Sequence, residues 1–222
     1  VWNPDLIRQY GGPGARYTSY PAATRFHEEV SLGDVQRSVA AGNRAHRNLS
    51  LYCHIPFCAS VCYYCACNRV ITANRERALP YIAHLKTEIR QKAALIDRQR
   101  PVVQMHWGGG TPTILPPDMI RDLAAALLDM APLAAGAEFS VEIDPNEFDQ
   151  ARCQALIDAG LTRASIGVQG FDDTTQQAIG RSLTFDRVAQ VVAMLRQGGV
   201  QDLSTDLLFG LPHQTLAQIR HS

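Results

Sequence analysis

The stretch Cys58-Ala59-Ser60-Val61-Cys62-Tyr63-Tyr64-Cys65-Ala66-Cys67 places four thiols within ten residues. It follows directly on an apolar run of strand length at 51–57, Leu-Tyr-Cys-His-Ile-Pro-Phe. Thiolates at this density repel one another unless a bound metal holds them together. We therefore expect the chemistry of the protein to be centred on this cysteine-rich loop, at the end of a strand.

Two kinds of metal site compete for these cysteines, and a disulfide is a third possibility. A structural zinc ion takes four Cys or His ligands, usually as two well-separated C-x2-C pairs. An iron–sulfur cluster also takes Cys thiolates, often bunched in one loop. Cys58, Cys62 and Cys65 have the spacing C-x3-C-x2-C, and no second pair follows downstream. The spacing therefore favours a cluster that is bound from one side only.

The bulk composition limits the class of protein. The chain has 222 residues, a formal net charge of +0 and 46% hydrophobic residues, enough for one sizeable core. The balanced charge gives no indication of nucleic-acid binding or of an acidic membrane surface, and no apolar run approaches the roughly 20 residues that span a bilayer. Six cysteines without secretory features predict reduced thiols and metal ligands in a cytoplasm.

The ends of the chain predict that it is part of a longer protein. It begins with Val1 rather than Met, and residues 215–222 stop inside a helical pattern. Residues 1–48 are expected to form an N-terminal arm. Asn3-Pro4 predicts a short helix to Tyr10, 16–21 an extended segment, and Ser31 a helix to Ala41 with Asp34 in a capping box.

From residue 49 onward, apolar runs of strand length alternate with amphipathic helical patterns. Strands are predicted at 49–54, 102–107, 138–143, 163–168 and 203–209. Helices are predicted at 75–96, from 117, at 149–159, at 173–179, from 184 and at the C-terminal end. Strict alternation implies an α/β fold with a parallel sheet. No G-x-G-x-x-G follows the first strand, so a partial barrel is favoured over a dinucleotide-binding sheet.

Two of the predicted strands end in a glycine run and a carboxylate. Gly109, Gly110 and Thr111 follow the second strand, and glycines there let the backbone approach a small zwitterionic ligand closely. Glu142 ends the third strand, where an acidic side chain faces the mouth of a site more often than solvent. The alternatives are an ordinary glycine turn and an outward-facing Glu142 beside a capping Asp144.

Three further polar residues follow later in the chain. Gln169 ends the fourth strand as a neutral donor and acceptor. Arg181 offers a fixed fork of donors that suits a carboxylate, although a surface ion pair is the plainer alternative. Asp206 lies within the apolar fifth strand, where burial of its charge requires a partner.

The cysteine spacing after a first strand resembles that of the radical S-adenosylmethionine (SAM) superfamily. An aromatic residue before the third cysteine, Tyr64, and the later run Gly109-Gly110-Thr111-Pro112 strengthen this resemblance. It implies a (βα)6-type partial barrel, of which five strands are visible here and the remainder is truncated. It also implies that Cys58, Cys62 and Cys65 bind three irons of a [4Fe–4S] cluster and that SAM binds the fourth.

Within that superfamily the chain resembles the oxygen-independent coproporphyrinogen III oxidases over nearly all its length. The motifs that carry this resemblance are Arg16-Tyr17-Thr18-Ser19-Tyr20-Pro21, Tyr52-x-His54-Ile55-Pro56-Phe57-Cys58, Cys65-x-Cys67-Asn68, residues 106–113 from His106 to Thr113, and Gly210-Leu211-Pro212. Cys67 completes the pattern C-x3-C-x2-C-x-C, which a related haem chaperone lacks together with the arm. Tyr64 stands where the family often has Phe.

The resemblance implies roles for individual residues. Tyr52, Gly109 and Glu142 are expected to contact a cluster-bound SAM. A second SAM molecule is expected to contact Tyr64, Gly110, Thr111, Gln169, Arg181 and Asp206. Cys67 is expected beside the cofactors without being one of the three cluster ligands. Residues 49–222 are then a radical SAM core that is incomplete at its C-terminus, with the C-terminal domain of the family absent.

The implied activity is anaerobic oxidative decarboxylation of two coproporphyrinogen III propionates to vinyl groups, which gives protoporphyrinogen IX in haem biosynthesis. A SAM-derived 5′-deoxyadenosyl radical starts this reaction in the family. The implied partners are the porphyrinogen and a one-electron donor such as flavodoxin, with a cytoplasmic monomer as the active form. No nucleic acid and no membrane is expected. The fragment alone is expected to aggregate or to lack turnover.

Other functions stay open at this point. A second radical SAM enzyme acting on haem has the same core, and a non-catalytic haem or cluster carrier or a zinc-stabilised binding module belongs to a different class. Cys53 and Cys153 are expected to be small buried hydrophobes rather than ligands. His54 and His106 are expected to be hydrogen-bonded core histidines rather than ligands.

Overall fold

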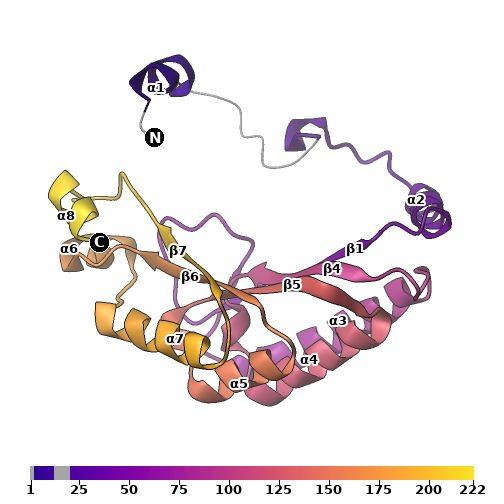
Figure 1. Ribbon diagram of the computed structural model, residues 1–222. Helices are drawn as coiled ribbons and strands as arrows, with labels where there is room; N and C mark the ends of the chain where they lie inside the picture. Colours follow the sequence, from indigo (N-terminus) through magenta and orange to yellow (C-terminus); the bar gives the residue numbers. More distant parts are fainter. Residues whose placement is uncertain (1–2, 13–20) are drawn as a thin grey trace. The chain divides into compact units, whose positions relative to one another are not determined.

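The computed structural model describes residues 3–12 and 21–222 (Figure 1). The chain divides into two compact units, Val1–Val39 and Ala40–Ser222. The first unit contains α1 (Pro4–Tyr10), the 3-10 turn η1 (Ala23–Arg25) and most of α2 (Leu32–Arg44). The predicted extended segment 16–21 lies, except for Pro21, outside the described residues. The predicted division at 48/49 stays a prediction.

The two predicted caps of this part are confirmed. The Asn3 side chain accepts hydrogen bonds from the backbone N–H groups of Asp5 and Leu6 at the start of α1. The Ser31 N–H donates to Asp34 Oδ2 at 2.8 Å, and the Asp34 N–H donates to Ser31 Oγ at 3.2 Å. The predicted end of α2 before Gly42 was wrong, because the helix continues to Arg44. A single glycine weakens a helix by only about 1 kcal/mol and does not by itself end it.

The second unit is built on one sheet of five parallel strands in the order β1-β4-β5-β6-β7. The strands are β1 (Leu49–Ile55), β4 (Val102–Gly109), β5 (Leu133–Ile143), β6 (Arg163–Gln169) and β7 (Asp202–Leu207). All five lie where the sequence predicts strands. The spatial order follows the chain order, so each crossover advances in the same direction around the sheet. A doubly wound sheet would reverse this direction, and the order therefore supports the partial barrel.

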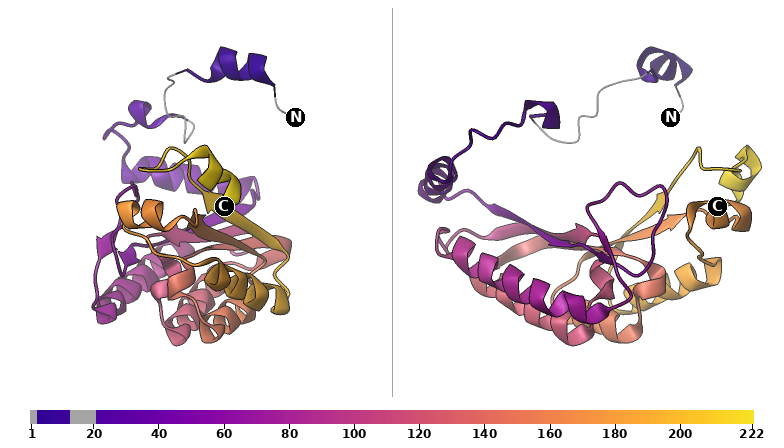
Figure 2. Two further views of the ribbon diagram at one scale, coloured as in Figure 1. Left: turned by 90° about the vertical axis from the view of Figure 1, so that its left-hand side faces the viewer. Right: turned by 180° about the vertical axis from the view of Figure 1, so that it is seen from behind.

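The crossover helices cover one face of the sheet (Figures 1 and 2). They are α3 (Ala78–Ala93), α4 (Pro117–Met130), α5 (Gln150–Asp158) and α7 (Phe185–Gln197). The core lies between this layer and the sheet, where Trp107, Phe139 and Leu195 have no exposed surface. Burial of the apolar helix faces provides the main stabilisation of such a layer, at about 25 cal/mol per Å² of apolar area. The opposite face of the sheet is left for the site.

A second, two-stranded parallel sheet was missed by the sequence reading. It pairs β2 (Phe57–Cys58) with β3 (Val70–Ile71). The intervening residues, which include the remaining cysteines of the motif, form a loop on the side of the main sheet away from the crossover helices (Figure 2). Strands of two residues have too few positions to show an alternating pattern, so sequence periodicity cannot detect them.

The remaining elements are short. They are η2 (Arg75–Arg77), η3 (Pro112–Ile114), η4 (Pro145–Glu147), α6 (Asp173–Ile179) and α8 (Leu216–His221). The Thr184 side chain caps α7, and Thr215 with Gln218 forms a capping box on α8. Across the described ranges 3–12 and 21–222, no helix has the length and apolar character that crossing a membrane requires.

Candidate functional site

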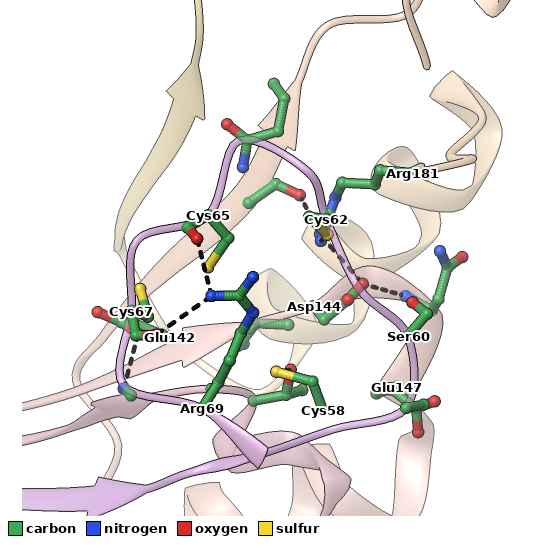
Figure 3. Close-up of a pocket in the computed structure, with 18 of the residues that line it drawn as sticks. Cys58, Ser60, Cys62, Cys65, Cys67, Arg69, Glu142, Asp144, Glu147 and Arg181 are labelled. Atoms are coloured by element: carbon green, nitrogen blue, oxygen red, sulfur yellow. Dashed lines mark hydrogen bonds and ion pairs between the residues drawn. The ribbon is translucent and has the colours of Figure 1, made fainter. Parts of the chain in front are cut away.

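A pocket opens where the cysteine loop meets the carboxyl ends of the sheet strands (Figure 3). The cysteine loop contributes Cys58, Cys62, Tyr64, Cys65 and Cys67 to its lining, and the strand ends and following segments contribute Gly109, Gly110, Thr111, Glu142, Gln169, Arg181 and Asp206. These are all the residues that the sequence predicts for the site except Tyr52. Because β1 to β7 are parallel, residues up to 148 positions apart in sequence meet at one edge of the sheet.

The cysteine loop is fixed at its base and near its tip. At the base, the Val70 N–H donates to Pro56 O at 2.7 Å and the Thr72 N–H donates to Cys58 O at 2.9 Å. Near the tip, the Tyr63 N–H donates to Ile179 O of α6 at 2.9 Å. The loop is therefore fixed both at its base and near its tip rather than projecting freely.

The thiols of the loop are suited to bind metal. All six cysteines are free thiols, and Cys58, Cys62 and Cys65 are half-buried in the pocket wall. Burial raises the pKa of Cys58 above its ordinary value, and burial together with the neighbouring Cys65 raises that of Cys67 to about 11. Such thiols stay protonated at neutral pH until a metal displaces the proton.

Hydrogen-bond donors are aimed at two of the sulfurs. The Thr111 hydroxyl lies 3.5 Å from Cys58 Sγ, and Arg181 Nη1 lies 3.6 Å from Cys62 Sγ. Within the described residues, Arg69 Nε and Arg181 Nε are buried without a hydrogen-bond partner. Donors around sulfur atoms and unpartnered buried donors fit a site for an anionic, thiolate-bound group.

The cysteines are not arranged around a single point. In the part of the chain that the structure describes, no three His, Cys, Asp or Glu side chains are grouped as one metal ion requires. One zinc ion holds its sulfur ligands at about 2.3 Å and so brings them within about 4 Å of one another. Cysteines that each bind a different iron of a cluster need not converge in this way. The arrangement is therefore better suited to a cluster than to a mononuclear ion.

The glycine run faces the pocket on one side and packs closely against the segment before the cysteine loop on the other. A Cβ on Gly110 would lie 2.6 Å from Pro56 O, and one on Gly109 would lie 2.8 Å from His54 Cε1. Gly109 also has a φ of +120°, which side-chain-bearing residues rarely adopt. These glycines allow the end of β4 to approach the chain segment that leads into the cysteine loop.

Glu142 is held at the pocket wall by this same run. The Gly109 N–H donates to Glu142 Oε2 at 3.1 Å, and His106 Nε2 lies 3.4 Å from Glu142 Oε1. The second His106 nitrogen lies 2.5 Å from Ser140 Oγ. Glu142 thus faces inward, which excludes the outward-facing alternative, and its carboxylate is oriented before any ligand binds.

Tyr52 lies beside the pocket rather than in its lining. Its ring stacks on His106 with 5.8 Å between centroids, its hydroxyl lies 2.9 Å from His54 Nδ1, and it is 62% exposed. His54 Nε2 in turn lies 2.9 Å from Asn68 O of the cysteine loop. Both histidines are hydrogen-bonded, as predicted, but they are half-buried, so the expectation that they lie in the core was wrong. Cys53 and Cys153 are buried, also as predicted.

Gln169 and Asp206 flank the far side of the pocket. Gln169 has a φ of +71°, a left-handed conformation that is strained in a residue with a side chain and that recurs at functional sites. The expectation that Asp206 is buried in an apolar strand was wrong. Its strand β7 lies at the edge of the sheet, and Asp206 is exposed, with long contacts of 3.3 and 3.4 Å from Ser165 Oγ as its only hydrogen bonds to residues that the structure describes.

Arg181 is anchored by a partner that the sequence did not predict for the site. Its Nη2 forms an ion pair with Asp144 Oδ1 at 3.2 Å and donates to Gly167 O at 2.9 Å. Burial lowers the pKa of Arg181, but Asp144, Tyr64 and Cys62 together raise it above its ordinary value, so the guanidinium stays charged. Asp144 was considered only as a cap, a role it also has through the Asn146 N–H at 3.0 Å. Arg69 was missed altogether, because a basic residue after a cysteine carries no periodic signal.

The fold and the site define an α/β protein with a cysteine-rich loop over the carboxyl ends of a partial barrel. The sequence model of the radical SAM superfamily matches residues 52–222. The chain belongs to the radical SAM superfamily.

Individual relatives point to one enzyme of that class. The chain is 41% identical over its full length to the oxygen-independent coproporphyrinogen III oxidase of Synechocystis sp., and 48% identical over 93% of its length to that of Paracoccus denitrificans. It covers 47% and 46% of these proteins, so it spans about half the length of the curated relatives it matches. Among solved structures, coproporphyrinogen III oxidase (HemN) of Escherichia coli, described as a radical SAM enzyme, superimposes with a TM-score of 0.89 at 36% identity, covering 100% of this chain and 49% of that one.

The superfamily uses a [4Fe–4S] cluster and SAM. The chemical groups that line the site suit both cofactors. The three thiols of C-x3-C-x2-C share one pocket with donors aimed at sulfur, which suits the cluster. The oriented Glu142 carboxylate and the charged Arg181 guanidinium suit the amino and carboxylate groups of an amino-acid ligand.

Proposed function

We propose that the complete protein catalyses the anaerobic oxidative decarboxylation of coproporphyrinogen III to protoporphyrinogen IX. The observation that carries this proposal is the single pocket in which the cysteine loop meets residues from the ends of β4, β5, β6 and β7. The names of the relatives, at 39–48% identity, support the choice of substrate. Cys67, the fourth cysteine of the motif, lines the same pocket.

We assign the cofactor contacts as follows. Cys58, Cys62 and Cys65 hold the three irons of the cluster. The cluster-bound SAM is held by Tyr52, Gly109 and Glu142, and a second SAM by Tyr64, Gly110, Thr111, Gln169, Arg181 and Asp206. When bound, the reduced cluster and SAM together supply a carbon-centred radical that removes a hydrogen atom from an unactivated carbon.

The protein itself must orient the substrate propionate and keep water away from it. Each propionate that becomes a vinyl group loses CO2, one proton and two electrons. Arginine and backbone N–H donors are the groups that hold a carboxylate in a fixed direction, and Arg181 and Arg69 are the guanidinium groups in the pocket. Asp144 fixes the direction of the Arg181 guanidinium, which we assign to a cofactor carboxylate. Arg69 is bonded to the loop backbone, so we assign neither arginine to the propionate.

The cellular setting is part of the proposal. We place the protein in the cytoplasm, since its six free cysteines suit a compartment that keeps thiols reduced. We further propose that a one-electron donor such as flavodoxin reduces it and that it acts as a monomer, without nucleic acid or membrane. We also propose that residues 1–48 are an N-terminal arm, that residues 49–222 are the radical SAM core, and that the lid over the substrate belongs to a part of the complete protein outside residues 1–222.

The test is anaerobic reconstitution of the full-length protein, followed by metal analysis and turnover. About four irons and four sulfides per chain are expected, and zinc in their place would remove the basis of the proposal. With reductant, SAM and coproporphyrinogen III, protoporphyrin fluorescence should appear after oxidation of the product. A protein that binds the cluster and cleaves SAM without forming any vinyl product would instead be a radical SAM enzyme with a different substrate. Residues 1–222 alone should not turn over.

A further inference from the structure

Arg69 lies at the point where the cysteine loop returns to the core. It immediately precedes β3, whose residue Val70 is bonded to Pro56 at the other end of the loop. The backbone position of Arg69 is therefore fixed by the β2–β3 pairing. Its side chain turns back into the loop that this pairing closes (Figure 3).

The guanidinium of Arg69 is bonded to the loop backbone. Nη1 donates to Cys65 O at 2.7 Å and to Cys67 O at 3.2 Å. In Figure 3 the guanidinium lies between Cys58 on one side and Cys65 and Cys67 on the other. One side chain thus connects the base of the loop to the segment that carries its last two cysteines.

The charge of Arg69 has no counter-charge in the described protein. Arg181, the other arginine of the pocket, pairs with Asp144, whereas Arg69 has no ion pair within residues 3–12 and 21–222. Its Nε is buried and has no hydrogen-bond partner among those residues. A half-buried cation with a free donor is costly unless a negative group faces it. The pocket carboxylates Glu142, Asp144 and Glu147 are bonded to Gly109, Arg181 and Arg75, which leaves the cysteine sulfurs of the same pocket as groups that can face Arg69 with a negative charge.

We propose that Arg69 is a positioning residue for the iron–sulfur cluster, which fixes the cysteine loop through two backbone carbonyls and provides the cation that balances the cluster's thiolate charge. This inference rests on the cluster assignment in the proposed function, but not on the substrate. A fixed cation favours the more negative, reduced form of a cluster and so raises its reduction potential. The two carbonyl bonds should slow the opening of the loop and hence the loss of iron.

The experiment compares reconstituted full-length protein with its Arg69→Gln and Arg69→Lys variants. The midpoint potential is measured by a redox titration followed by electron paramagnetic resonance, and iron loss by absorbance of a ferrous chelate. Arg69→Gln should have a more negative midpoint potential and lose iron about tenfold faster. Arg69→Lys keeps the charge but not the fork, so its potential should stay near the wild-type value while iron loss is still faster.

Arg196→Gln is the matched control. Arg196 also bonds two backbone carbonyls, those of Val200 and Gln201, but at the opposite end of the sheet. This variant should change neither the potential nor the iron loss. If Arg69→Gln has the wild-type potential and iron retention, the inference is wrong. If Arg69→Gln is folded by circular dichroism but takes up no cluster, the inference is supported. If Arg69→Gln does not fold, the midpoint potential of Arg69→Lys decides. A large negative shift of the Arg69→Lys potential contradicts a role of the charge.

The inference and the proposed function can fail separately. If the wild-type protein binds the cluster but makes no vinyl product, the proposed substrate is wrong and the Arg69 measurements still stand. If the wild type turns over normally and Arg69→Gln matches it in midpoint potential and iron loss, only the proposed role of Arg69 is wrong.

Discussion

Asp144 and Arg181 form an ion pair across the pocket wall, with 3.2 Å between Oδ1 and Nη2 and side-chain exposures of 20% and 11%. Asp144 follows β5 and Arg181 follows α6, so the pair joins two consecutive β–α connections. It also orients Arg181 so that its other terminal nitrogen, Nη1, reaches Cys62 Sγ. The charge on the pocket wall and the position of the cysteine loop are thereby linked.

Asp144→Asn should destabilise the protein by about 1–3 kcal/mol, because it leaves the guanidinium without its counter-charge in a mostly buried position. Asn retains an oxygen that can accept from the Asn146 N–H, so the cap at that residue should survive. Urea unfolding followed by circular dichroism measures the loss. Asp118→Asn, which breaks an exposed pair with Arg121, is the control and should cost under about 1 kcal/mol. Equal losses in the two variants would contradict the structural role of the buried pair.

Cys58→Ser should abolish the visible absorption of the reconstituted cluster and all cleavage of SAM. Three thiolates must hold three irons, and an alcohol at one position does not replace a thiolate. Iron and sulfide analysis beside the absorption spectrum checks this expectation. Full cluster content in the variant would show that the three ligands are assigned wrongly.

Cys67→Ser should keep the cluster and impair turnover only. Cys67 lines the pocket and its backbone is held by Arg69, but the spacing C-x3-C-x2-C is already complete without it. The same spectra as for Cys58→Ser, with a product assay added, separate the two variants. A cluster that disappears in Cys67→Ser would mean that this residue is one of the ligands.

Gly110→Ala should destabilise the core by about 1–3 kcal/mol and reduce cluster uptake. The new Cβ would meet backbone atoms of Pro56 and Phe57 at 2.6 to 2.8 Å, and backbone cannot yield as a flexible side chain can. Gly12→Ala, whose added Cβ has no atom of the described residues within 4 Å, is the matched control. Unfolding midpoints of the two variants that coincide would show that this close approach is not needed.

Raising the pH should remove the stability that comes from the buried Cys53 thiol. Burial, with a smaller effect of Glu88, raises the pKa of Cys53 to about 12. Because the folded value lies above the unfolded one, near 8.5, this stability is fully present below about pH 8.5 and is lost as the pH rises toward about 12. Relative to Cys53→Ala, the wild type should lose about 1.4 kcal/mol per pH unit in that window. Urea unfolding of both proteins below and above about pH 8.5 tests this expectation. A difference in unfolding free energy between the two proteins that stays constant with pH would contradict it.

The sequence predicted those parts of the molecule that depend on periodic burial or on local chemistry. The five strands of the main sheet and its crossover helices follow from apolar patterns, and the caps at Asn3 and Ser31 follow from side chains next to their own backbone. Pocket residues at strand ends, such as Glu142 and Gln169, could be named because parallel strands bring their carboxyl ends together, whereas Tyr64 was named from the resemblance to the family.

The errors and omissions share a different cause. The exposure of Asp206 depends on β7 being at an edge, the pairing of Asp144 with Arg181 on a contact between two connections, and the position of Arg69 on a ladder of two residues. Each is a long-range or very short-range feature that leaves no repeating pattern in the chain. Such features become visible only when the neighbours of each side chain are known.

The bond between the Tyr63 N–H and Ile179 O has a consequence for the order in which the protein matures. It connects residues that are 116 positions apart, so we expect it to form late, after β4, β5 and β6 have taken their places in the sheet. The same delay is expected for the contact between Arg181, which follows α6 in the chain, and Cys62 Sγ. A newly made chain thus presents its cysteines as separate thiols, and they acquire their final surroundings only when most of the barrel is complete. We therefore expect loading of the metal into its finished site to be a late step, and a chain interrupted before α6 to have the cysteine motif but not the site.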